Sequence, residues 1–312
     1  MGTYSGEEGG TQRRRGLYPV AGVVFSALFL SACAGRIHMP GYVQPVEESS
    51  LSFESLGHTV QVDAYVPEGK GQRHPAAIVL HGSSGIHMVG GSGAQRYAEA
   101  LANRGIAAYV VHYFDGTGTF SADDATEARE YWRWVHVIRD AVGWLRARPE
   151  VRPSRVGIVG VSLGAYVAVG AAASDPRVSR VVLMSGGLEP GIADSVRRFP
   201  PVLLLHGTAD NVVPVAAEDT LTRLFTRHRV TMTVHRYPGE GHDLGDKAAV
   251  DAVDRSARFL ADRPLRMLLD AVKRAEVRLA PSPAPAKAPP PAPPPAPPPA
   301  PPPRDTLHPL IP

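Results

Sequence analysis

The stretch 156–164, Val-Gly-Ile-Val-Gly-Val-Ser-Leu-Gly, constrains the fold of this chain more than any other part of it. A short apolar run ends at Gly160, and a helix-forming segment begins directly after Ser162. Glycines stand two residues before and two residues after the serine, as in the G-x-S-x-G turn that leads from a buried strand into a helix. Such a turn has no room for side chains at its flanks, and it exposes the serine hydroxyl at a helix N-terminus, where the helix dipole favours negative charge. The pattern therefore predicts Ser162 as a nucleophile at the end of a parallel strand.

Two later turns carry residues that could activate this serine. Asp210 ends the turn after one apolar run, and His242 lies in a Pro/Gly loop after an alternating run. The order Ser, Asp, His occurs in one class of catalytic triads and differs from the orders in chymotrypsin and subtilisin. In such a triad the histidine removes the serine proton, and the aspartate orients the imidazole and stabilises its charged form. The less well placed rival acids are Glu240, Asp243 and Asp219.

A third Gly-rich turn predicts donors for an oxyanion. The apolar run 76–80 opens into His81-Gly82-Ser83-Ser84-Gly85. Folds with this type of nucleophile turn hold the oxyanion with the N–H after the nucleophile and one N–H from the loop after the third strand. We therefore expect the backbone N–H groups of Leu163 and Ser83 to form the hole, with Gly82 allowing close approach of the backbone.

The motifs around Gly82, Ser162, Asp210 and His242, together with Tyr113-Phe114-Asp115-Gly116, resemble those of the dienelactone hydrolase family of the α/β-hydrolase superfamily. The resemblance covers about residues 50–265. Dienelactone hydrolases proper carry a cysteine as nucleophile and a glutamate directly after the first motif's histidine, where this chain has Ser162 and Gly82. The resemblance thus implies a serine-nucleophile relative that cleaves small-molecule carboxylic esters, with dienelactone itself in doubt as the substrate.

The alternation of strand and helix candidates predicts the fold. Apolar runs indicate eight strands, at about 51–55, 59–66, 76–80, 106–112, 155–160, 178–184, 201–206 and 230–237. Helical segments are expected near 94–104, 125–147, 163–173, 215–228 and 246–278. Most of the runs are continuously apolar, as buried parallel strands are. We expect an α/β fold of the α/β-hydrolase type, with a mostly parallel, eight-stranded, doubly wound sheet and the three triad candidates at the carboxyl ends of its strands.

The N-terminal segment has the composition of a targeting signal. Three arginines at 13–15 precede the apolar stretch 17–30, which is too short to span a membrane as a helix. The following Leu-Ser-Ala-Cys resembles the lipobox of bacterial lipoproteins, in which the cysteine is lipidated; Cys33 is the only cysteine of the chain. A plain secretory signal and an uncleaved anchor are the alternatives. The expected organisation is a signal peptide at 1–32, a linker at 33–50, the hydrolase domain at 51–278 and a proline-rich disordered tail at 279–312.

Composition limits the partners. Residues 281–303 contain fifteen prolines in twenty-three positions, which predicts polyproline II structure that acts as a spacer or binds a partner with a polyproline-binding groove. The net charge is only +3, and no basic stripe is interleaved with aromatics, so we expect no nucleic acid. The twelve histidines form no HExxH or Cys/His cluster, and we expect no metal and no cofactor.

The expected function is an extracytoplasmic serine hydrolase of the bacterial cell envelope, anchored to a membrane through lipid on Cys33. Two alternatives stay open. One is a peptidase of the prolyl-oligopeptidase type, although only 17 residues separate Cys33 from the first predicted strand, which leaves no room for the usual propeller. The other is an envelope scaffold with an inactive hydrolase domain, which has no need of an intact triad. The acyl and alcohol groups of the substrate depend on loop packing, which the sequence does not indicate.

Overall fold

The computed structural model describes residues 45–69, 71–86, 92–193, 196 and 198–261. The predicted signal peptide, Cys33 and the proline-rich tail lie outside the described residues, so those predictions stay predictions. Within the described ranges, no helix combines the length and the apolar character needed to cross a membrane.

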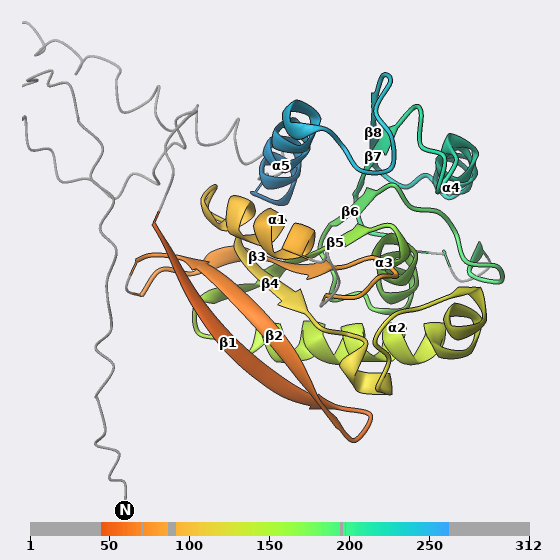
Figure 1. Cartoon of the computed structure of the whole chain (residues 1–312). Coiled ribbons are helices and arrows are strands. Elements are labelled where there is room, and N and C mark those ends of the chain that lie inside the picture. The colour runs from red at the N-terminus through yellow and green to blue at the C-terminus, as the bar shows by residue number, and fades with distance from the viewer. Residues whose placement is uncertain (1–44, 70, 87–91, 194–195, 197, 262–312) are drawn as a thin grey trace, which may run out of the picture. The chain divides into compact units, whose positions relative to one another are not determined.

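One eight-stranded sheet forms the centre of the domain (Figure 1). In the order in which they lie side by side, its strands are β1 (Val46–Ser55), β2 (His58–Pro67), β4 (Ala107–Val111), β3 (His74–Leu80), β5 (Val151–Val161), β6 (Val181–Met184), β7 (Val202–Gly207) and β8 (Met232–Tyr237). The pairs β1–β2 and β2–β4 are antiparallel, and all the others are parallel. The predicted mostly parallel, doubly wound sheet of the α/β-hydrolase fold is confirmed.

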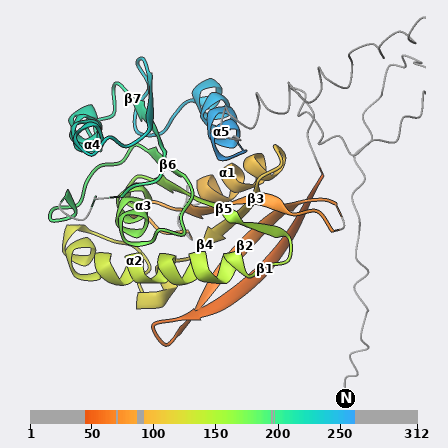
Figure 2. The same cartoon turned by 180° about the vertical axis from the view of Figure 1, so that it is seen from behind.

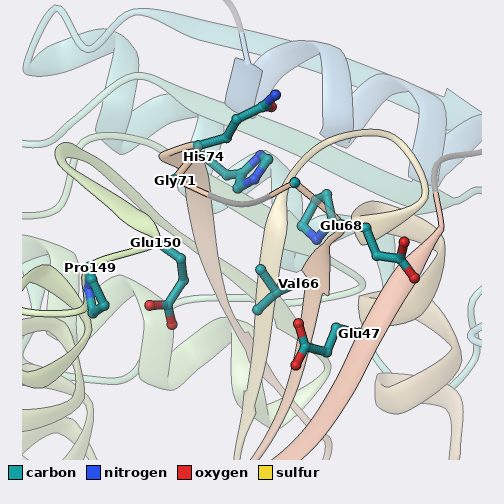
Figure 3. Close-up of a pocket in the computed structure, with 10 residues that line it drawn as sticks. Glu47, Val66, Glu68, Gly71, His74, Pro149 and Glu150 are labelled. Atoms are coloured by element: carbon teal, nitrogen blue, oxygen red, sulfur yellow. The ribbon is translucent and has the colours of Figure 1, made fainter.

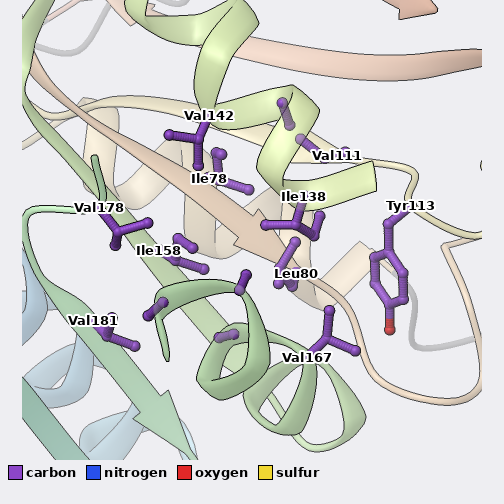
Figure 4. Packing of buried hydrophobic residues seen from close by; sticks show 14 of the residues in the cluster. Ile78, Leu80, Val111, Tyr113, Ile138, Val142, Ile158, Val167, Val178 and Val181 are labelled. Atoms are coloured by element: carbon purple, nitrogen blue, oxygen red, sulfur yellow. The ribbon is translucent and has the colours of Figure 1, made fainter. Parts of the chain in front are cut away.

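Helices cover both faces of this sheet (Figures 1 and 2). The helices α1 (Ser92–Ala102) and α5 (Asp246–Ala261) contribute to one apolar cluster, and α2 (Asp124–Arg146), α3 (Leu163–Ser174) and α4 (Val215–Arg227) contribute to the other. Alternate side chains of a strand point to opposite faces. Ile78 and Leu80 of β3 therefore pack with α2 and α3 (Figure 4), while their neighbours Ala77 and Val79 pack with α1 and α5.

Two strands begin earlier than the sequence predicts. The strand β1 starts at Val46, so residues 46–50 belong to the sheet and not to the expected linker. Most of these residues are polar and exposed, because β1 is an edge strand, and they give no apolar signal. The strand β5 starts at Val151 instead of 155, and its pairing with β3 slips between the pairs His74–Val151 and Ala76–Val156. The slip accommodates the polar residues 152–155, which include a proline. The predicted strand begins only at the end of this stretch, because the stretch gives no apolar signal.

Candidate active site

Three strands of the parallel half of the sheet bring the predicted triad together. Ser162 follows β5 directly, Asp210 lies in the turn after β7, and His242 lies in the loop after β8. The carboxyl ends of parallel strands lie at one edge of a sheet, so these positions converge although they are far apart in the chain. The Nε2 atom of His242 is 3.0 Å from Ser162 Oγ, and its Nδ1 atom is 2.9 Å from Asp210 Oδ2. The arrangement is one continuous hydrogen-bonded chain from carboxylate to hydroxyl.

Ser162 has a strained backbone conformation. Its φ is 54° and its ψ is −125°, and α3 begins at the next residue. A side chain at Gly164 would place its Cβ 2.6 Å from the carbonyl oxygen of His81, and one at Gly160 would collide with the backbone of Gly164. The flanking glycines are therefore required by close packing of the backbone, as the sequence motif predicts. The Ser162 N–H donates to Met184 O at 3.0 Å, which ties the turn to the neighbouring strand β6.

The carboxylate of Asp210 is buried and held by directed donors. Its Oδ1 accepts hydrogen bonds from the backbone N–H groups of Val212 (2.9 Å) and Val213 (2.8 Å), while Oδ2 accepts from His242. Burial by itself would raise the pKa of Asp210, but the hydrogen bonds from His242 and the two amides outweigh burial and hold the pKa below the ordinary value of 3.8.

The ionised Asp210 fixes the state of the histidine. A carboxylate only accepts hydrogen bonds, so Nδ1 of His242 carries the proton. In the neutral ring, Nε2 then presents a lone pair to the Ser162 hydroxyl, which is the tautomer that a general base needs. The backbone oxygen of His242 also accepts a hydrogen bond from Ser185 Oγ at 3.3 Å.

Two of the rival acids are engaged elsewhere. The carboxylate of Glu240 accepts a hydrogen bond from the Gly245 N–H at 2.7 Å and closes its own loop. Asp219 forms an ion pair with Arg236. Asp210 is thus the acid that contacts His242.

The loop that carries the first predicted oxyanion donor lies against the serine. A Cβ added to Gly82 would be 3.3 Å from the Cβ of Ser162. The Gly85 N–H donates to Gly82 O at 3.1 Å and forms a tight turn in which Ser83 is the second residue. The second predicted donor, Leu163, is the first residue of α3. Both amides therefore belong to segments that adjoin Ser162.

An aromatic cluster from the Tyr113-Phe114-Asp115-Gly116 motif supports this loop. The Tyr113 hydroxyl donates to the backbone oxygen of His81 at 3.0 Å, and the two rings are stacked with centroids 4.3 Å apart. Phe114 meets the same imidazole edge-on at 4.7 Å, and the Ala122 N–H donates to Ser83 O at 2.8 Å. The segment after β4 thus fixes the position of the loop 81–85. The motif identifies Tyr113 and Phe114 in the sequence, and the structure adds the contacts by which they support the loop.

A separate cavity of about 430 Å³ lies at the other end of the sheet (Figure 3). Its lining includes His74 at the amino end of β3 and Glu150 just before β5, so it opens at the amino ends of the strands. The residues described around it include no serine or cysteine that could act as a nucleophile. Among the residues that the structure describes, no three His, Cys, Asp or Glu side chains are grouped so as to hold a metal ion.

Comparison with known proteins identifies the family of this chain and structures that share its fold. The sequence profile of the dienelactone hydrolase family matches residues 62–263. An uncharacterised protein of Mycobacterium tuberculosis is 25% identical over 218 residues, which cover 61% of this chain and 72% of that protein. A dienelactone hydrolase-like promiscuous phosphotriesterase from metagenomic libraries superposes with a TM-score of 0.61 at 19% identity, over 69% of this chain and 97% of that one.

Two further solved structures share the fold. A cold-adapted esterase from an Arctic intertidal metagenomic library has a TM-score of 0.54 at 22% identity, over 70% of this chain and 97% of its own. A puromycin-hydrolysing peptidase of Mycobacterium tuberculosis has a TM-score of 0.55 at 17% identity, over 71% of this chain but only 40% of its own.

Proposed function

The chain belongs to the dienelactone hydrolase family, and from that premise we propose that it is a serine hydrolase that cleaves carboxylic esters through an acyl-enzyme on Ser162. The observation that carries the proposal is the unbroken hydrogen-bonded chain from Asp210 through His242 to Ser162. A serine hydroxyl is a weak nucleophile at its own pKa, so the contact with a correctly protonated imidazole is what the chemistry requires.

The reaction follows from the positions of these groups. Ser162 Oγ attacks the ester carbonyl carbon while Nε2 of His242 takes its proton, and Asp210 stabilises the imidazolium that results. The N–H groups of Ser83 and Leu163 hold the oxyanion of the tetrahedral intermediate, with the N-terminus of α3 adding its dipole. The bond from carbon to the ester oxygen then breaks, and the leaving alcohol takes the proton from His242. Water attacks the acyl-enzyme by the same steps and restores the serine.

The coverage of the related structures supports an esterase over a peptidase. The chain corresponds to nearly the whole length of the esterase and the phosphotriesterase, but to two fifths of the peptidase. We propose small esters as substrates because the two solved structures that this domain matches over nearly their whole length are an esterase and a phosphotriesterase. A purely structural role in the envelope would not need the hydrogen-bonded alignment of three separate segments.

We further propose that the hydrolase is anchored through lipid on Cys33 and faces away from the cytoplasm. The support is the sequence of the N-terminal segment: a basic start, a short apolar stretch and Leu-Ser-Ala-Cys. On this proposal the substrates are small-molecule esters that occur in the bacterial cell envelope.

A fluorophosphonate probe and p-nitrophenyl acetate test the assignment of the nucleophile. We expect the probe to label Ser162 in the wild type and to leave Ser162→Ala unlabelled. Ser162→Ala and His242→Ala should each lose at least about a thousandfold in kcat, and the double variant should lose little more, because triad members act as a unit. Ser174→Ala, at the distant end of α3, is the matched control and should keep the wild-type rate. Wild-type hydrolysis by Ser162→Ala, or a label on another serine, would overturn the proposal.

A further inference from the structure

A second histidine is buried directly behind the aspartate of the triad. His206 is the fifth residue of β7, four residues before Asp210, and it is only 1% exposed. Its Nε2 atom lies 3.3 Å from Asp210 Oδ2, the same oxygen that accepts the hydrogen bond from His242 at 2.9 Å. The carboxylate of Asp210 thus lies between two imidazole rings, one facing the serine and one facing the protein interior.

A closed ring of contacts joins His206, Val213 and Asp210. The Nε2 atom of His206 is 2.8 Å from Val213 O, and the Val213 N–H donates to Asp210 Oδ1 at 2.8 Å. A backbone carbonyl only accepts hydrogen bonds, so Nε2 of His206 must carry a proton. That N–H points at the carbonyl and lies beside the second oxygen of the carboxylate. The ring of contacts therefore leaves the Asp210 carboxylate little freedom to rotate.

The other side of the His206 ring faces a buried carboxylate. Its Nδ1 atom is 3.9 Å from Glu218 Oε2 of α4, an oxygen without a hydrogen-bond partner among the described residues. The other oxygen of Glu218 accepts from Arg236 Nε of β8 at 2.7 Å. The side chain of Glu218 is 2% exposed, so α4 and β8 hold His206 from behind. The charged and titratable groups around the pair of His206 and Asp210 are Glu218 of α4 with its ion-pair partner Arg236 of β8, His242 of the following loop and Tyr166 of α3.

We propose that His206 is a positioning residue of the hydrolytic site, which holds the carboxylate of Asp210 in the orientation that aligns His242 with Ser162. The proposal rests on the proposed function, because His206 acts only through Asp210 and His242. A ring that is 1% exposed does not touch substrate, so its contribution belongs to kcat and not to KM. The N–H at Nε2 of His206 also partly compensates the negative charge of Asp210. The Asp210 carboxylate therefore stabilises the imidazolium form of His242 less strongly than it would without His206.

Kinetics of His206→Leu and His206→Gln test the role. Leucine fills the space without a donor, and we expect kcat for p-nitrophenyl acetate to fall on the order of ten- to a hundredfold with KM unchanged. Glutamine can place an amide N–H near the position of Nε2 and should recover most of the rate. The acid limb of the kcat profile should move to higher pH in His206→Leu, because the carboxylate of Asp210 then favours the protonated His242 more strongly. His74→Leu, which removes a buried histidine at the amino end of β3, is the matched control and should keep the wild-type kcat.

A double variant separates positioning from core packing. In an Asp210→Asn background, His206→Leu should add less than about threefold, because two residues that act through one group are not additive. If His206→Leu melts at a lower temperature but keeps the wild-type kcat and pH profile, His206 is a packing residue and the proposal is wrong. An equal loss of kcat with and without the Asp210 carboxylate also overturns it.

A measurement without substrate keeps this inference separate from the proposed function. The titration of the His242 ring, followed by NMR, should shift to higher pH in His206→Leu relative to the wild type. An unchanged midpoint overturns the positioning role whatever the substrate is. Failure of the proposed function has a different signature, namely a wild type that hydrolyses no ester and takes no label at Ser162.

Discussion

At the scale of single residues, the site depends on a backbone conformation that serine rarely adopts. With φ at 54° and ψ at −125°, Ser162 occupies a region that favours glycine. A residue in such a conformation lowers the free energy of unfolding by about 1–3 kcal/mol, and the conformation persists because the surrounding structure fixes it. Here the tight contacts of Gly160 and Gly164 and the hydrogen bond to Met184 O fix the turn. The turn that presents the Ser162 hydroxyl therefore lowers the stability of the fold.

Removing the side chain of Ser162 in two ways measures this strain. The free energy of unfolding of Ser162→Gly should exceed that of Ser162→Ala by about 1 kcal/mol, because glycine adopts the positive φ without strain. For a domain of this size the difference corresponds to a rise in Tm of about 2–4 °C. Both variants lack the nucleophile, so thermal melting is the measurement.

Ser256, in the interior of α5, is the control for this comparison, because both of its variants lose the same hydrogen bond from Tyr97. In the interior of a helix, glycine is less stable than alanine by about 0.5–1 kcal/mol, so the order of the two variants should reverse there. Equal melting of Ser162→Gly and Ser162→Ala would show that the turn stores no strain.

The sequence predicts the three residues of the triad but not their supports. Ser162, Asp210 and His242 each follow a strand and lie in turns with recognisable glycines, so local patterns identify them. His206 ends the apolar run 202–205, where a lone histidine has the same pattern as a core residue. Its partner Glu218 comes from a different element, and no spacing in the chain encodes their contact.

At the scale of elements, α3 is fixed at both ends, by the serine turn at its start and by an ion pair at its end. Asp175 follows the last turn, and its side chain is 2% exposed. It accepts hydrogen bonds from the backbone N–H of Arg177 and from its guanidinium, and that guanidinium also donates to Arg139 O of α2 at 2.9 Å. The ion pair thus ties the end of α3 to the neighbouring helix.

Replacing this carboxylate should destabilise the domain in a pH-dependent way. Burial by itself would raise the pKa of Asp175, but the hydrogen bonds from Arg177 outweigh burial and hold the pKa below the ordinary value of 3.8. A lowered pKa in the folded state contributes stability that is present above the ordinary pKa and is lost as pH falls through the folded value. We expect Asp175→Asn to lose about 2 kcal/mol of unfolding free energy at pH 7, as for a hydrogen bond to a charged group.

Denaturant unfolding at several pH values checks this expectation. The difference between wild type and Asp175→Asn should narrow below about pH 4. Asp123→Asn, at the exposed N-cap of α2, is the control and should unfold close to the wild type, because asparagine caps a helix about as well as aspartate. A difference that stays constant from pH 7 to pH 3 would show that the charge of Asp175 contributes nothing.

The elements themselves follow from the sequence wherever an apolar run defines them. The six strands β2, β3, β4, β6, β7 and β8 lie within a few residues of their predicted positions. The starts of β1 and β5 are missed, because one is a polar edge and the other includes an irregular pairing with a proline. Both are set by partners elsewhere in the sheet, and a local pattern does not contain that information.

At the scale of the whole molecule, the proposed catalytic residues lie inside the described domain, while the proposed location rests on the N-terminal segment. Cys33→Ala should remove the protein from the membrane fraction or leave an unprocessed species, and intact-mass analysis of the wild type should show a lipidated Cys33. Stable anchoring needs more than one acyl chain, so the measured mass should correspond to several acyl chains.

The Cys33→Ala variant should react with the fluorophosphonate probe at the wild-type rate, because Cys33 has no part in the triad. An unmodified Cys33 in the mature wild type would contradict the lipoprotein proposal.

The separation of 80 positions between Ser162 and His242 has a consequence for timing. A chain that is synthesised or exported from its N-terminus presents the serine and the loop around Ser83 long before the imidazole arrives. Until β8 and the loop behind it have formed, the hydroxyl has no base and remains inert. Pairing of parallel strands from distant segments is also among the slower steps of folding. On the proposed function, hydrolysis therefore begins only when β8 and the loop after it are in place, and unfinished chains are harmless to the ester-containing molecules around them.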